Sequence, residues 1–233
     1  MPNTALHLTA SSVHSCLAPA SGGRGVWALG LWNDEMKSKK PLSIPWTHHR
    51  GYYRLALENW RRIQDLKAEH DAIEQTLAGK KSISDDDAIQ LAVKNDAIGE
   101  LALVVVIFCA FTLEAYINHY GINRLSKNYH TKYLDKLDVV AKWVVIPRLV
   151  TGKELGPGSR AVQDLSWLVG LRNKLAHYKT KLLTLSEIKT SDFLWYEDAE
   201  HAIRTVERIM ADLKSIDHGA EADWVGSGER PKA

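Results

Sequence analysis

Apolar side chains recur at steps of three and four residues over most of this chain, and that spacing is typical of amphipathic α-helices. Strand-like alternation of useful length does not occur, and no internal repeat is present. The pattern predicts an all-α fold, an up-and-down bundle of four to five helices. The expected helices cover residues 49–77, 85–124, 129–150, 159–178 and 192–216.

The ends of these segments carry recognisable helix signals. Ser84, followed three residues later by Asp87, resembles a capping box, and Ser159 stands where the fourth helix should start. Asp138 is expected to interrupt the third segment, and Pro147 to bend or end it. Lys179 to Ser191 forms an irregular connector by composition.

The pattern also divides the chain. Residues 1–45 lack periodic apolar positions and are expected to be poorly ordered; residues 46–216 form the bundle; residues 217–233 form a loose tail. The longest apolar run, residues 101–112, is too short to span a bilayer, and no secretory signal is visible. Cys16 and Cys109 are widely separated, which favours a reducing compartment. We expect a cytoplasmic protein with no membrane partner.

The fourth helix carries an anomaly. Leu165, Leu168 and Leu175 make an apolar stripe, and Arg172 falls in its middle, while Asn173 and His177 lie on its flank. A guanidinium cannot lose its charge, so on a packed face it needs an anion or a water-filled cleft.

A second anomaly lies in the helix expected to be central. Residues 101–117 are apolar on every side, which predicts a fully surrounded helix, yet Glu114 interrupts them. A buried carboxylate requires a partner. We therefore predict that Glu114 meets Arg172, with Asn118 one turn further along. Such a pair can be purely structural.

Charge is uneven although the net charge is only +2. Residues 120–181 hold 12 Lys and Arg against 4 Asp and Glu, and this basic block contains Arg172 and His177. The excess favours a polyanionic partner, although a solvated basic face is the commoner meaning. Likewise, His177, Lys174 and Lys179 can simply complement a helix C-terminus. The spacing of cysteines and histidines predicts no metal site, and no cofactor is expected.

Three stretches, residues 111–118, 142–147 and 168–179, resemble the HEPN domain (higher eukaryotes and prokaryotes nucleotide-binding), over about residues 85–215. The resemblance depends most on the motif Arg172-Asn173-x-x-x-His177. It implies an all-α bundle and, in many members, a metal-independent endoribonuclease of toxin–antitoxin, phage-defence or RNA-processing systems. In such enzymes the motifs of two subunits meet across a homodimer interface.

The resemblance implies that Arg172, His177 and Asn173 are catalytic, with Glu114 and Asn118 supporting them. Contacts to RNA would come from Lys174, Tyr178, Lys179 and Lys181. An antitoxin or defence-system protein is a further expected partner. Toxins paired with nucleotidyltransferase antitoxins often carry a tyrosine two residues after the histidine; here Lys179 occupies that position and Tyr178 precedes it.

Two other interpretations stay open. The first is a non-catalytic HEPN-like module that binds a protein or nucleotide partner, in which Arg172 only neutralises Glu114. The second is a generic helical adaptor with a basic face.

Overall fold

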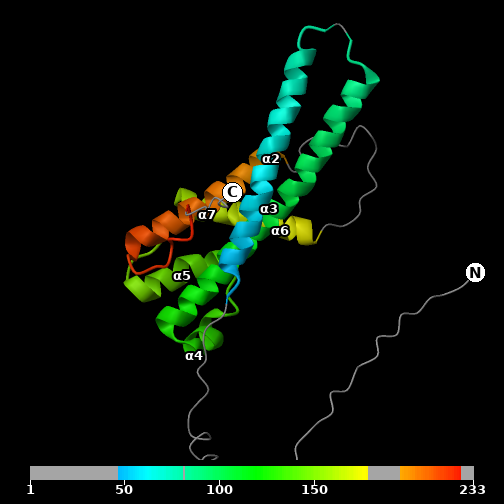
Figure 1. Cartoon of the computed structure of the whole chain (residues 1–233). Coiled ribbons are helices and arrows are strands. Elements are labelled where there is room, and N and C mark those ends of the chain that lie inside the picture. Colours follow the sequence, from blue (N-terminus) through cyan, green and yellow to red (C-terminus); the bar gives the residue numbers. More distant parts are fainter. Residues whose placement is uncertain (1–46, 81, 178–194, 227–233) are drawn as a thin grey trace, which may run out of the picture. The chain divides into compact units, whose positions relative to one another are not determined.

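The fold of this chain is all-α. The computed structural model describes residues 47–80, 82–177 and 195–226 and contains no strand within them (Figure 1). The chain clusters into two units, residues 1–44 and 45–233, and all that follows concerns the second. Its elements are α2 (His49–Leu77), α3 (Asp85–Leu125), α4 (Lys127–Tyr129), the π-helix η1 (His130–Leu134), α5 (Val139–Thr151), α6 (Arg160–Ala176) and α7 (Tyr196–Ile216). The expectations for residues 1–45, and those for Tyr178, Lys179 and Lys181, lie outside the described residues.

The helix starts follow the local signals in the sequence. Ser84 accepts the Asp87 N–H at 3.2 Å, and Ser159 accepts the Val162 N–H at 3.4 Å. Asp138 does interrupt the third segment, because its side chain caps α5 by accepting the Ala141 N–H at 2.9 Å. Pro147 lies inside α5 and does not end it; the helix continues to Thr151, and Gly152 in the left-handed conformation follows.

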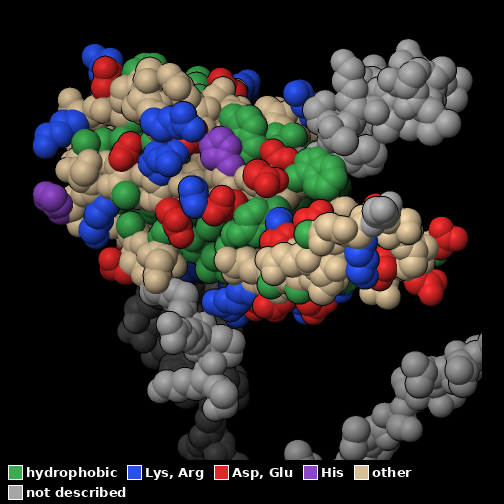
Figure 2. Space-filling model, turned by 90° about the horizontal axis from the view of Figure 1, so that it is seen from above, with side chains coloured by type: hydrophobic (Ala, Val, Ile, Leu, Met, Phe, Trp, Pro, Cys, Tyr) green, Lys and Arg blue, Asp and Glu red, His purple; other side chains and the backbone are tan. Residues whose placement is uncertain are grey.

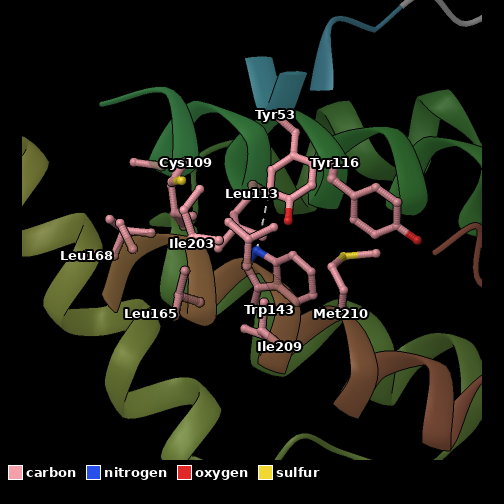
Figure 3. Packing of buried hydrophobic residues seen from close by; sticks show 14 of the residues in the cluster. Tyr53, Cys109, Leu113, Tyr116, Trp143, Leu165, Leu168, Ile203, Ile209 and Met210 are labelled. Carbon is pink, nitrogen blue, oxygen red and sulfur yellow. Dashed lines mark hydrogen bonds between the residues drawn. The ribbon is translucent and has the colours of Figure 1, made fainter. Parts of the chain in front are cut away.

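α3 is the central helix of the bundle and packs against α2, α5, α6 and α7. Trp143 of α5 is fully buried and donates its indole N–H to the Leu113 carbonyl of α3 at 3.2 Å (Figure 3). Leu165 and Leu168 of α6, together with Ile209 of α7, complete this part of the core (Figure 3). Burial of these large side chains positions α6, the helix that carries Arg172.

The expectation that residues 101–117 are fully surrounded is wrong. Leu103 is 40% exposed and Phe111 is 37% exposed, so one stripe of α3 faces solvent. The reason is that the neighbouring helices cover the rest of its circumference and leave this side open. Of the described helices, α3 alone has the length and apolar composition needed to cross a membrane, a test that buried core helices also pass; 44% of its apolar window is buried.

The expected loose tail is wrong for residues 217–226, which pack against α2 and α3. Asp217 is buried, accepts the Tyr120 hydroxyl at 2.8 Å and pairs with Arg124 at 3.1 Å. Trp224 packs its ring against those of Tyr53 and Tyr116, with centroids 5.4 and 5.6 Å apart. This segment lacks helical periodicity, so its burial depends on surfaces that distant helices supply.

Gly121 of α3 is a position at which the packing of η1 on α3 can be tested by substitution. A Cβ there would lie 2.7 Å from Cδ2 of His130, a ring that is itself buried, whereas a Cβ on Gly170 of α6 meets nothing within 4 Å. We expect Gly121→Ala to lower the free energy of unfolding by about 1–3 kcal/mol through overpacking. The matched Gly170→Ala should raise it by roughly 0.5–1 kcal/mol, because alanine favours the helix. Denaturant unfolding measures both. Equal effects at the two positions would contradict the packing of η1 on α3.

Candidate functional site

The site begins with Arg172, which lies on the same side of α6 as the buried Leu165 and Leu168. Its Nη2 donates to Oε2 of Glu114 on α3 at 2.8 Å. The predicted ion pair is therefore present. It joins two helices that are 58 residues apart in sequence.

The surroundings of this pair differ from the prediction in one respect. The side chain of Glu114 is 38% exposed and that of Arg172 is 21% exposed, so Glu114 is not a buried carboxylate. It lies on the solvent-facing stripe of α3 beside Phe111, and the Arg172 guanidinium lies 6.0 Å from the Phe111 ring centroid. Nε of Arg172 is buried and has no hydrogen-bond partner in the described part of the chain. The guanidinium therefore keeps donors that Glu114 does not use.

Asn118 does not join this ion pair, although it lies one turn further along α3. Its Oδ1 accepts from Nζ of Lys142 on α5 at 2.9 Å. Lys142 is only 4% exposed, and among the described residues it forms no ion pair with a carboxylate. Sequence reasoning missed this lysine, although its place between Val139 and Ile146 in an apolar helix was a usable signal.

The remaining motif residues occupy the exposed end of α6. His177 caps the helix, and its backbone N–H donates to the Asn173 carbonyl at 3.0 Å. Asn173, Lys174 and His177 are all exposed, and no hydrogen bond or ion pair engages their side chains within residues 47–80, 82–177 and 195–226. The structure thus brings Arg172 to Glu114, and it leaves His177 open to solvent at the same end of α6.

The opposite end of α6 holds a charge cluster that the sequence reasoning also missed. Asp164 is 4% exposed and pairs with Arg160 at 2.9 Å and with Arg208 of α7, and Nε2 of His201 lies 3.1 Å from its Oδ1. Burial lowers the pKa of His201, whose ring stacks on Trp167 with centroids 4.0 Å apart. The ion pair of Asp164 with Arg208 is a structural link between α6 and α7. Its signal in the sequence, an acid on the buried side of α6, was available.

One group of side chains tests the expectation of no metal site. The ligand-type atoms of His70, Asp71 and Glu74, all on α2, lie within 4.8 Å of one another. Lys67 also bonds Asp71, so a fixed ammonium already neutralises one of these carboxylates. The group therefore lies outside the Arg172 site, which residues of α3 and α6 form.

His49, at the start of α2, makes stability depend on pH. Burial, with smaller contributions from His119 and Arg50, lowers the pKa of His49 to about 4, and its ring packs edge-on to Tyr116. Because the unfolded state then binds more protons than the folded state, stability should fall as the pH drops from about 6.5 to 4, by on the order of 2 kcal/mol. Thermal unfolding across this range measures the slope, and His49→Phe should flatten it. An unchanged slope in that variant would assign the effect to other groups.

The face of the molecule drawn in Figure 2 does not carry one continuous basic field. On the face drawn in Figure 2, Lys and Arg side chains alternate with Asp and Glu, and hydrophobic side chains lie between them. The described lysines and arginines of residues 120–177 belong to several elements, from the end of α3 to α6. Any polyanion must contact particular groups on this surface.

Fold and site together define a class: an all-α bundle with an arginine–glutamate pair at the solvent-facing stripe of its central helix and an exposed histidine at the end of the arginine's helix. Comparison of the chain with protein-family models, with curated proteins and with solved structures finds no match.

Proposed function

We propose that this protein is a metal-independent endoribonuclease of HEPN type that cleaves RNA as a homodimer. One observation carries the proposal: Arg172 lies at the open stripe of α3, held by Glu114 at 2.8 Å, with His177 exposed at the end of the same helix. A permanently charged fork and an imidazole free to exchange protons are the two groups that phosphodiester cleavage by a 2′-hydroxyl requires.

Arg172 would stabilise the transition state. Glu114 occupies one of its donors and orients the guanidinium, and the remaining N–H groups can bind the non-bridging oxygens of a phosphodiester as charge grows on them. Packing against Phe111 limits the motion of the Arg172 guanidinium. A positioned, partly desolvated cation interacts more strongly with that charge than a fully hydrated one does.

His177 would transfer the protons. An imidazole can take the proton from the ribose 2′-hydroxyl or give one to the leaving 5′-oxygen. Attack of the 2′-oxygen on phosphorus breaks the bond to the 5′-oxygen and leaves a 2′,3′-cyclic phosphate. Asn173 and Lys174, exposed beside His177, would contact the same RNA strand.

A second copy of the chain would complete the site. Five residues separate Arg172 from His177, so at about 100° per residue the two side chains leave α6 roughly 140° apart. One copy therefore presents its guanidinium and its imidazole to different directions. Two copies related by a two-fold axis can place the partner's imidazole opposite the guanidinium. An antitoxin or defence-system protein would regulate such a dimer in the cytoplasm.

The ion pair itself favours a second candidate function. In a non-catalytic HEPN-like module, Glu114 and Arg172 would only join α3 to α6, and the exposed end of α6 would bind a protein or nucleotide partner. The two functions differ in whether covalent bonds of RNA are broken.

Incubating the purified protein with total RNA in the presence of a chelator tests the proposal. We expect fragments that end in 2′,3′-cyclic phosphate, and no cleavage of a matched oligonucleotide with 2′-deoxyribose at every position. Intact RNA over a range of protein concentrations, with the dimer verified by light scattering, would refute the catalytic function and favour the binding module.

A further inference from the structure

A second surface, outside the Arg172 site, displays two exposed aromatic rings. Tyr129, at the end of α4, is 41% exposed, and Tyr133 in η1 is 57% exposed. Their ring centroids are 5.1 Å apart with the planes inclined by 52°. A single exposed tyrosine is ordinary, but two adjacent exposed rings form a contiguous aromatic surface of the kind that marks interaction sites. We call Tyr129, Lys132 and Tyr133 the tyrosine platform.

The platform is mounted on a fixed support. His130 directly follows Tyr129, and Leu134 directly follows Tyr133. These two residues are only 2% and 4% exposed. His130 packs against Gly121 of α3, where no side chain intervenes. Burial of one side of η1 therefore holds the rings of the other side outward. π-Helical turns of this kind occur frequently at functional sites.

Positive charge accompanies the rings. Nζ of Lys132 lies 5.0 Å from the centroid of the Tyr133 ring, a cation–π geometry. Lys127 and Lys136, on the same short segment, are also exposed. Among the described residues these three lysines form no ion pair with an acid, so their charge is available to a ligand.

We propose that the tyrosine platform is a stacking site for the bases of single-stranded RNA. Exposed aromatic rings accept the π-face of any base, and neighbouring lysines contact the phosphates between them; this combination is how proteins bind single strands without reading their sequence. The exposed lysines beside the rings favour a polyanion, because an apolar protein surface would desolvate their charges without neutralising them.

This inference rests on the proposed function, since it assigns the platform to the same RNA. Gly121, on which η1 packs, is seven residues along α3 from Glu114, or about 10 Å at 1.5 Å per residue. Figure 1 shows α4 at the end of α3 opposite the α2–α3 turn. His130, which supports the platform, therefore contacts α3 about 10 Å along the helix axis from Glu114. The platform binds RNA beside the cleavage site and takes no part in the chemistry.

The test measures binding apart from cleavage. The probe is a fluorescein-labelled oligouridylate of about 12 nucleotides with 2′-O-methyl groups, which cannot be cut. The full-length protein is titrated in fluorescence anisotropy as wild type, as Tyr129→Ala/Tyr133→Ala and as Tyr129→Phe/Tyr133→Phe. Leu149→Ala, an exposed apolar residue of α5, and Lys153→Gln are matched controls. Circular dichroism verifies that every variant is helical.

We expect the double alanine variant to bind at least about tenfold more weakly, while the phenylalanine variant, which keeps the rings, stays near wild type. Both controls should change the dissociation constant less than about twofold. Lys132→Gln should lower the slope of log binding constant against log salt concentration by about the amount that one phosphate contact contributes. Equal binding by the wild type and the double alanine variant, or no binding by the wild type, would overturn the platform.

Cleavage assays on the same variants separate this inference from the proposed function. If the wild type binds the probe through the tyrosines and cuts no RNA, the platform stands and the ribonuclease proposal fails. If the wild type cuts RNA and the double alanine variant both binds and cuts as the wild type does, the ribonuclease stands and the platform fails.

Discussion

His177→Ala should abolish RNA cleavage and leave the fold intact. Loss of a general acid or base slows catalysis by about 10²- to 10⁴-fold. The side chain is exposed and makes no hydrogen bond or ion pair in the described part of the chain, so the free energy of unfolding should change by less than about 0.5 kcal/mol. Single-turnover cleavage of a labelled RNA and thermal unfolding measure the two quantities.

His218→Ala is the matched control, because His218 is also exposed but lies in the segment after α7. It should keep full activity. Unimpaired cleavage by His177→Ala would remove this residue from the mechanism. A marked loss of helical signal or thermal midpoint in that variant would show instead that the imidazole supports the end of α6, as the structural interpretation of a basic helix C-terminus holds.

Asp164→Ala should produce the largest loss of stability. The carboxylate is 4% exposed and pairs with both Arg160 and Arg208, so its removal leaves two guanidinium groups without a counter-charge where α6 meets α7. Breaking a buried pair costs about 3–5 kcal/mol, and because both arginines can partly reach solvent we expect about 3 kcal/mol. Thermal and denaturant unfolding both report it.

Asp96→Asn on α3 is the control for charge removal, since Asp96 is exposed and forms no ion pair among the described residues. It should change stability by less than about 0.5 kcal/mol. A comparably small effect of Asp164→Ala would mean that apolar packing alone joins α6 to α7. Because α6 also carries Arg172, the proposed ribonuclease should lose activity in Asp164→Ala only at temperatures where unfolding begins.

Local signals account for what was predictable about the helices. The α2 bounds agree with the pattern of apolar positions, and α3 starts where Ser84 caps it. These features depend on neighbours within four residues, which a sequence displays directly. The pairing of Glu114 with Arg172 was predictable for a different reason: charges on apolar stripes must find partners, and the chain offered few.

The ion pair shows where such reasoning ends. It predicted the partners correctly and their burial wrongly, because the exposed fraction of Glu114 depends on how α2 and α6 cover α3. Lys142 with Asn118, and Asp164 with Arg208, join different helices. No periodicity within one helix reports which residues of another helix will face it.

By itself the sequence determined the all-α character of the chain, the starts of α2, α3 and α6 and the need of Arg172 for an anion, because spacing, capping and desolvation act over a few residues or on a single charge. Only the tertiary structure decided that one stripe of α3 faces solvent, that residues 217–226 pack on α2 and α3, and that Tyr129 of α4 and Tyr133 of η1 are exposed. Each of these depends on which surfaces distant segments cover, and packing settles that only when the whole chain is in place.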